Sequence, residues 1–172
     1  IELLKRTPSA FLGSCRFKMP KIEGHEDVYE KVFEIMEKHD IECLFYAGGN
    51  DSMDTADKLS RWAAHNNKEI SFIGVPKTID NDIWGTDMTF GFQSAVNIAT
   101  DAIDCIHTTA ASHSRVFIVE VMGHKVGWLT LHAGIAGGAD IILIPEIPYD
   151  IEKVVEAINR RNKAGKGFTI LA

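Results

Sequence analysis

The chain has 172 residues, of which 45% are hydrophobic and 24% charged, a composition typical of one globular domain. Eighteen lysines and arginines against 24 aspartates and glutamates give a formal net charge of −6. This acidic balance argues against a general binder of nucleic acids or anionic membranes, because both reward excess positive charge. Apolar runs are far shorter than the roughly 20 residues that span a bilayer. We expect a cytoplasmic protein in which Cys15, Cys43 and Cys105 are free thiols.

Helices and strands are predicted to alternate along the chain. Helices are expected where apolar residues recur at helical spacing, and strands where a short apolar run meets turn residues. The predicted helices cover about 27–39, 51–65, 95–106, 126–136 and 151–158; the predicted strands cover 43–47, 70–75, 116–121, 141–144 and 168–171. The strands are continuously apolar, which favours an α/β protein whose parallel sheet is covered by helices. We expect a loop segment over 1–24 and one α/β domain over 25–172.

A loop of unusual composition follows each of the first four predicted strands. In open parallel sheets, ligands bind beyond the carboxyl ends of the strands. We therefore expect these loops to converge on one crevice. They cover residues 48–52, 76–82, 122–125 and 145–146.

The first loop combines two glycines with three polar residues, in the order Gly48, Gly49, Asn50, Asp51 and Ser52. Glycine lets a ligand approach the backbone closely, and the start of the following helix favours an anion. The side-chain oxygens of Asn50 and Asp51 suit a hard cation such as Mg²⁺. The alternative is an ordinary turn in which Asp51 or Ser52 caps the helix.

The second loop places Asp80 and Asp82 beside Thr78, with Lys77 adjacent. A carboxylate here can accept the proton of an attacking hydroxyl, and a lysine can neutralise a phosphate. Phosphoryl transfer needs both parts. The alternative is an Asx-rich surface turn.

Other polar side chains leave two interpretations open. Arg16 and Arg115 either contact phosphate or are simply solvated. A phosphate contact of Arg115 could reach across a subunit boundary. His124 and Lys125 fit either a phosphate site at a helix start or plain surface charge. The seven histidines lack metal-ligand spacing and no cysteine pair accompanies them, so no zinc site is predicted.

Several separated motifs stand together in the order and spacing of the phosphofructokinase family, which the chain resembles over nearly its whole length. The resemblance implies a Rossmann-like three-layer α/β fold with a mainly parallel sheet. It also implies transfer of a phosphoryl group to the 1-hydroxyl of fructose 6-phosphate in glycolysis, giving fructose 1,6-bisphosphate. Because family motifs should precede residue 1 and follow residue 172, we expect a fragment with little activity of its own. The matching motifs lie at 12–16, 48–52, 76–82, 120–123, 136–140 and 145–146.

The resemblance assigns a role to each candidate residue. Asp80 matches the catalytic base, Arg16 matches an arginine at the transferring phosphoryl group, and Lys77 joins them as a catalytic position. The implied substrate-binding residues are Thr78, Asp82, Arg115, Met122, Gly123, His124 and Glu146. The implied donor-binding residues are Gly48, Gly49, Asp51 and Ser52, with Asn50 and Asp51 as ligands of Mg²⁺. The arginine matched by Arg115 reaches the sugar phosphate of a neighbouring subunit, which implies a homodimer or homotetramer.

Two positions favour diphosphate as the phosphoryl donor. ATP-using members of the family typically carry Gly where this chain has Asp51 and Lys77, whereas diphosphate-using members typically carry Asp and Lys. A side chain at 51 would crowd the α-phosphate of ATP, and Lys77 would neutralise the small, highly charged diphosphate. The chain thus resembles the diphosphate-dependent 6-phosphofructokinases. The alternatives are an ATP-dependent 6-phosphofructokinase and a non-catalytic, sugar-phosphate-binding regulatory relative.

Overall fold

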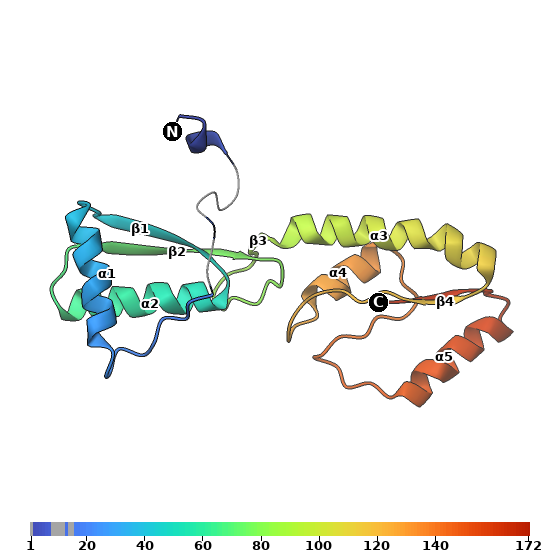
Figure 1. Ribbon diagram of the computed structural model, residues 1–172. Coiled ribbons are helices and arrows are strands. Elements are labelled where there is room, and N and C mark those ends of the chain that lie inside the picture. The colour runs from blue at the N-terminus through green and yellow to red at the C-terminus, as the bar shows by residue number, and fades with distance from the viewer. Residues whose placement is uncertain (1, 8–12, 14–15) are drawn as a thin grey trace. The chain divides into compact units, whose positions relative to one another are not determined.

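The computed structural model describes residues 2–7, 13 and 16–172, which form two compact units. Unit 1 comprises Ile1–Tyr46 and Asp51–Gly74, and unit 2 comprises Ala47–Asn50 and Val75–Ala172. In the described part of the chain, no helix is long and apolar enough to cross a bilayer. The elements are η1 (Leu4–Arg6), α1 (Glu26–Lys38), β1 (Cys43–Gly48), α2 (Asn50–His65), β2 (Ser71–Thr78), β3 (Phe90–Gly91), α3 (Phe92–His113), β4 (Val116–Ile118), α4 (Trp128–Ala136), α5 (Ile151–Lys163) and β5 (Thr169–Leu171) (Figure 1).

The core of unit 1 lies between α1, α2 and the strands. The apolar residues of α1 recur at helical spacing, so Tyr29, Phe33 and Met36 share one buried face. Tyr29 packs against Trp62 of α2 with ring centroids 5.2 Å apart. Phe33 meets Phe72 of β2 edge-on at 5.8 Å. Aromatic contacts of this kind bury large apolar areas and join the helices to the sheet.

The other face of these strands is open. Along β1, Leu44 is partly buried whereas Phe45 is 66% exposed, and Ile73 of β2 is 44% exposed. The apolar run at 43–47 forms the predicted strand, but the expectation that helices cover the sheet is wrong for one face of it. Alternate side chains of a strand point to opposite faces, and the core of unit 1 covers only one of them.

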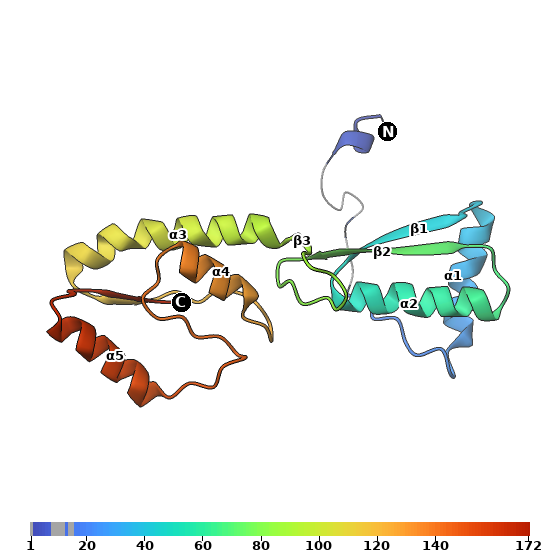
Figure 2. The same ribbon diagram turned by 180° about the vertical axis from the view of Figure 1, so that it is seen from behind.

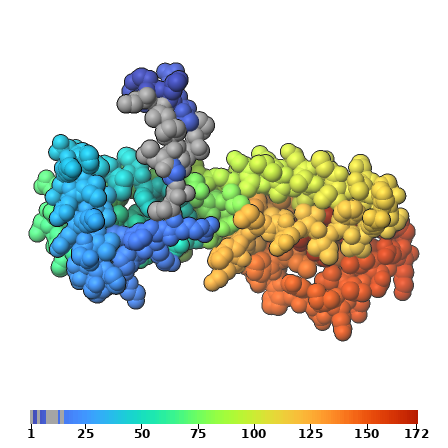
Figure 3. Space-filling view, viewed as in Figure 1, coloured from blue at the N-terminus to red at the C-terminus, as the bar shows by residue number. Residues whose placement is uncertain are grey.

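Unit 2 has helices on both sides of its strands. In both ribbon views, α3 and α5 lie on opposite sides of the pair β4–β5 (Figures 1 and 2). One cluster contains Ile103 and Ala110 of α3, Ala133 of α4 and Ile170 of β5, each fully buried. The atoms of α3 form a continuous ridge, coloured yellow-green to yellow, along this unit (Figure 3). The three-layer α/β arrangement that was predicted is confirmed here.

The described strand pairs β2–β3 and β4–β5 are parallel, as predicted. The described strands form two sheets, β1-β2-β3 and β4-β5, rather than one. Lys77 of β2 pairs with Phe90 of β3, and Val116 of β4 pairs with Thr169 of β5. The chain is therefore an α/β protein built on parallel strands.

Three predicted strands differ from the structure by more than one residue. β2 does not stop before Pro76 but continues to Thr78, because a proline near a strand end removes only one ladder donor. β4 ends at Ile118 rather than at 121. Residues 141–144 make a single parallel bridge, Ile141 to Leu171, and no regular strand.

Candidate active site

The first and second predicted loops meet through side chains that belong to unit 2. Thr78 ends β2, and its Oγ1 accepts a hydrogen bond of 3.2 Å from the backbone N–H of Asp80. Asn50 Nδ2 donates to Asp82 Oδ2 at 2.6 Å. A Cβ at Gly49 would lie 3.9 Å from Thr78 Cβ, so the glycine loop also lies against this strand end. The predicted convergence of the first two loops is confirmed for these residues.

The loop that carries Asp80 is held by two residues that sequence analysis did not single out. Asn81 has a left-handed backbone with φ 54°, and its Oδ1 accepts a 2.8 Å bond from the N–H of Thr89. The Thr89 hydroxyl is buried and donates to the carbonyl of Thr78 at 2.8 Å. An asparagine between two aspartates in a polar loop is a weak sequence signal for a left-handed residue. By contrast, Trp84 within the same loop is 99% exposed.

The segment after β4 makes a tight turn. Val126 N donates to the Gly123 carbonyl at 3.0 Å, and a Cβ at Gly123 would collide with the Val126 carbonyl. His124 has a left-handed φ of 55°, and Met122 is 72% exposed. The turn therefore requires glycine at 123 and presents the two neighbouring side chains at the surface of unit 2.

One apolar cluster supports both this segment and the Asp80 loop. Phe92, Val96 and Leu129 are its buried members. Ile79, next to Asp80, packs against the cluster, as does Val121, next to Met122. The third predicted loop therefore shares its support with the second.

The fourth predicted loop reaches the start of α4. Glu146 Oε1 accepts a 2.7 Å bond from the backbone N–H of Gly127. A carboxylate is favoured there by the exposed N–H groups and the dipole of the helix. A Cβ at Gly127 would overlap Ile144 and approach Glu146, so this contact depends on glycine. The structure thus joins Glu146 to the 122–127 segment.

Arg115 was predicted as a site residue, but in unit 2 it lies away from these loops. It directly precedes β4, and its carbonyl accepts a bond from Thr169 N at 3.2 Å. Met122 to His124 instead follow the carboxyl end of β4. A strand separates the two positions, so the role of Arg115 at the site stays a prediction.

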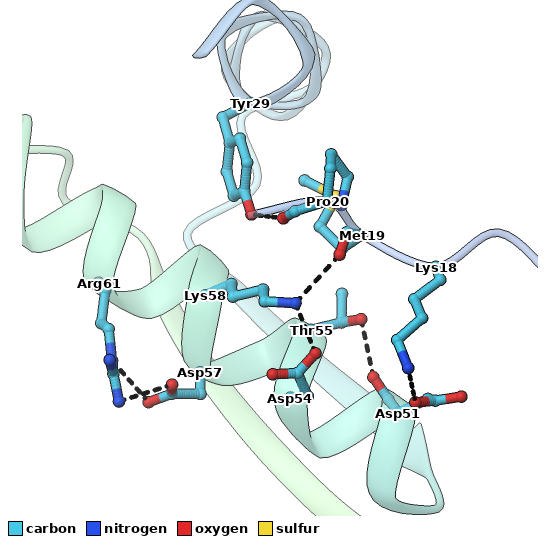
Figure 4. A network of polar contacts seen from close by, with 10 residues as sticks. All are labelled: Lys18, Met19, Pro20, Tyr29, Asp51, Asp54, Thr55, Asp57, Lys58 and Arg61. Atoms are coloured by element: carbon cyan, nitrogen blue, oxygen red, sulfur yellow. Dashed lines mark hydrogen bonds and ion pairs between the residues drawn. The ribbon is translucent and has the colours of Figure 1, made fainter. Parts of the chain in front are cut away.

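In unit 1, a pocket of about 370 Å³ joins the Arg16 segment to the first turn of α2. Lys18 Nζ lies 2.9 Å from Asp51 Oδ1 across it (Figure 4). The hydrogen bond and charge of Lys18 lower the pKa of Asp51, and Asp51 raises the pKa of Lys18. The lining residues are Arg16, Phe17, Lys18, Tyr46, Asp51, Ser52 and Thr55. Three predicted residues, Arg16, Asp51 and Ser52, therefore share a pocket. Of the motif at 12–16, the structure describes only Gly13 and Arg16, so Cys15 lies outside the described residues.

Two side chains anchor the segment behind Arg16. Lys58 of α2 donates to the Met19 carbonyl at 3.0 Å and pairs with Asp54 at 2.6 Å (Figure 4). Tyr29 of α1 donates its hydroxyl to the Pro20 carbonyl at 2.6 Å, and burial raises the pKa of this tyrosine. Residues 18–20 are thereby fixed along α2.

Asn50 and Asp82 fit one part of a magnesium site. Asp82 Oδ1 is buried and lacks a hydrogen-bond partner among the described residues, and Asn50 lies beside the same carboxylate. Asp51 is engaged by Lys18. Over residues 2–7, 13 and 16–172 no group of three or more His, Cys, Asp or Glu side chains could hold a metal ion. The donor set suits Mg²⁺ that is bound through few protein ligands and through ligand phosphates, which is the usual magnesium pattern.

Comparison with known proteins places this chain in a family. Residues 1–172 match the family model described as Phosphofructokinase. The chain belongs to the phosphofructokinase family. It is 54% identical over 142 residues to a Spirochaeta thermophila protein named ATP-dependent 6-phosphofructokinase, covering 83% of this chain and 37% of that protein. It is 45% identical over 163 residues to ATP-dependent 6-phosphofructokinase 3 of Bacteroides thetaiotaomicron, covering 93% and 47%.

Solved phosphofructokinase structures share the fold. A crystal structure described as pyrophosphate-dependent phosphofructokinase from Marinobacter aquaeolei matches with a TM-score of 0.82 and 36% identity, over 99% of this chain and 43% of that one. One from Nitrosospira multiformis, also described as pyrophosphate-dependent, gives 0.84 and 34%, over 99% and 44%. This phosphofructokinase chain thus spans less than half the length of each of these four relatives.

Proposed function

We propose that this phosphofructokinase chain carries acceptor and donor contacts of a cytoplasmic, glycolytic phosphotransferase. The reaction is transfer of a phosphoryl group from diphosphate to the 1-hydroxyl of fructose 6-phosphate, giving fructose 1,6-bisphosphate. The observation that carries this proposal is the bond between Asn50 and Asp82 beside Asp80, at the ends of neighbouring strands. We further propose that residues 25–172 form the central α/β part of the family's fold.

The proposed chemistry assigns the proton to Asp80. The oxygen of the 1-hydroxyl bonds to a phosphorus of diphosphate, the bond from that phosphorus to the bridging oxygen breaks, and inorganic phosphate leaves. Asp80 takes the hydroxyl proton as the new bond forms. Lys77 and Arg16 neutralise charge on the donor, and electrostatic stabilisation of this kind is the main contribution a protein makes to phosphoryl transfer.

The remaining side chains are proposed to bind substrate and metal. Thr78, Asp82, Met122, Gly123, His124 and Glu146 bind the sugar phosphate, and Gly48, Gly49, Asp51 and Ser52 bind the donor. Mg²⁺, when bound, neutralises phosphate charge. Asn50 would hold it together with the unpartnered oxygen of Asp82, whereas Asp51 would first have to leave Lys18. Arg115 is proposed to act on a neighbouring subunit of a homodimer or homotetramer.

The donor is the finer part of this proposal. Asp51 places a carboxylate in the pocket that also contains Arg16, which suits a small donor better than one carrying a nucleotide. The alternative is ATP, because the two curated relatives above are named ATP-dependent. The two crystal structures are described as pyrophosphate-dependent, so the relatives do not separate the donors.

The experiment is a donor swap in the full-length protein. Turnover of fructose 6-phosphate with Mg²⁺ is measured with diphosphate and with ATP, for the unmodified enzyme and for Asp51→Gly with Lys77→Gly. We expect the unmodified enzyme to prefer diphosphate, and the ratio of kcat/KM to move toward ATP by about tenfold or more, which is about 1.4 kcal/mol.

A matched variant separates crowding from charge. Asp51→Asn with Lys77→Met removes both charges but keeps a side chain at each position. If crowding excludes ATP, this variant loses diphosphate turnover without gaining ATP turnover. An unchanged donor ratio in the Gly variant contradicts the donor assignment, and binding of fructose 6-phosphate without turnover by either donor favours a regulatory relative.

A further inference from the structure

We propose that Thr89 is a positioning residue which, together with Asn81, fixes the loop that carries Asp80. This inference rests on the function proposed above, in which Asp80 is the base. Thr89 belongs to none of the motifs that point to the family, and its side chain is 3% exposed. A buried hydroxyl so close to a candidate active-site loop needs a reason.

The contacts of Thr89 supply that reason. Its Oγ1 donates to the carbonyl of Thr78 at 2.8 Å, and its backbone N–H donates to Asn81 Oδ1 at 2.8 Å. Asp80 lies between these two partners in the chain. Thr89 therefore holds the loop on both sides of the proposed base, from a position 9 residues further along.

Asn81 requires this support. Its φ of 54° is left-handed, a conformation that costs free energy for any residue except glycine and that Asn tolerates best among the others. Its side chain binds Thr89 N through Oδ1 and donates to the Asp87 carbonyl at 3.3 Å through Nδ2. Such a backbone persists only where its surroundings hold it in place.

Thr89 also connects the loop to the rest of unit 2. Phe90, the next residue, pairs with Lys77 of β2, and Phe92 N donates to the Thr89 carbonyl at 3.3 Å at the start of α3. Phe92 itself is buried in the apolar cluster. The Asp80 loop is thus tied through Thr89 to the buried start of α3.

The consequence for the reaction is geometric. A general base must lie within about 2.6–3.2 Å of the proton it removes, and a misplacement of about 1 Å can cost roughly 10²-fold in rate. Loosening the loop should therefore lower kcat more than it raises KM for fructose 6-phosphate, because positioning of the base matters at the chemical step.

The test compares Thr89→Val with Thr89→Ser in the full-length enzyme. Valine has the same shape but cannot donate to Thr78, whereas serine keeps the hydroxyl. We expect Thr89→Val to lower kcat by about tenfold or more, within the range that misplaced groups cost, with a smaller change in KM and an increased solvent deuterium isotope effect on kcat. Thr89→Ser should retain kcat within about threefold and the original isotope effect, because it keeps the bond. Partial unfolding would not increase the isotope effect.

A second variant covers the case in which Thr89→Val does not fold. Asn81→Gly keeps access to the left-handed backbone but removes the acceptor for Thr89 N, and we expect the same loss of kcat with an increased isotope effect. Equal kcat and isotope effect in the folded Val and Ser variants, or an unchanged kcat in Asn81→Gly, overturns the inference while leaving the proposed function intact. Absence of turnover by the unmodified enzyme with either donor overturns the proposed function, and the inference with it.

Discussion

Lys18 and Asp51 illustrate what a single ion pair does at the donor pocket. The carboxylate of Asp51 would repel an anionic donor at the start of α2, a place that otherwise favours anions. Lys18, at 2.9 Å, offsets that charge. Because both side chains are well exposed, the pair contributes little to folding and matters mainly for the local charge.

We predict that Lys18→Met raises the pKa of Asp51 toward its ordinary value. Lys18 lowers the pKa of Asp51 below its ordinary value. The ion pair is therefore intact at a pH above the ordinary pKa and is lost as the pH falls through the lowered pKa. The measurement is a carboxyl-carbon NMR titration of Asp51. Lys21→Met, in the same segment, is the control, and an unmoved Asp51 titration in Lys18→Met contradicts the prediction.

Contacts between two predicted loops were easier to anticipate than contacts made by residues outside those loops. Asn50 and Asp82 were predicted to converge because the ends of parallel strands meet at one edge, and their 2.6 Å bond confirms it. Lys18 and Thr89, the partners of Asp51 and Thr78, were missed because neither lies in a loop that the sequence places at the end of a strand. No local pattern encodes such pairings.

At the scale of elements, all five predicted helices are present, although α3 and α5 extend seven and five residues beyond their predicted ends, whereas the predicted strand over 141–144 is absent. The apolar face of α1 can be recognised from the spacing of its own residues, whereas the ends of β2 and β4 depend on the strands that pair with them. Lys77 and Thr78 are strand residues because Phe90 and Gly91 lie alongside. For this reason the second loop starts at residue 79, three residues later than predicted.

Gly137, which follows the last residue of α4, has no room for a side chain. A Cβ at Gly137 would lie 2.8 Å from Ile103 of α3 and 3.0 Å from the Ala133 carbonyl. We predict that Gly137→Ala lowers the free energy of unfolding by about 1–3 kcal/mol through overpacking. Gly167→Ala, where the nearest atom is Ser114 Oγ at 3.5 Å, is the matched control. Chemical denaturation of both variants measures the difference, and equal stabilities would contradict it.

At the scale of the whole molecule, each unit has its own apolar core. Phe33 lies with Tyr29 and Trp62 in unit 1, and Ile103 lies with Ala133 and Ile170 in unit 2. We predict that Phe33→Ala, a substitution that typically costs about 3–5 kcal/mol, speeds amide hydrogen exchange in α1 and α2 more than in α3 and α4.

The mirror-image variant is the control for that prediction. Ile103→Ala should speed exchange in α3 and α4 more than in α1 and α2, because the cavity then lies in the other core. If either substitution raises exchange equally in all four helices, the two cores unfold as one cooperative unit and the prediction fails.

Two of the three tryptophans differ sharply in exposure and can serve as optical reporters. Trp62 is 7% exposed in the core of unit 1, whereas Trp84 is 99% exposed in the loop between Asp82 and Thr89. Iodide in solution can therefore quench the emission of Trp84 while leaving that of Trp62 largely intact. Trp128 at the start of α4 is 46% exposed, so a Trp128→Phe variant is needed before fluorescence can follow the Asp80 loop and the unit 1 core separately.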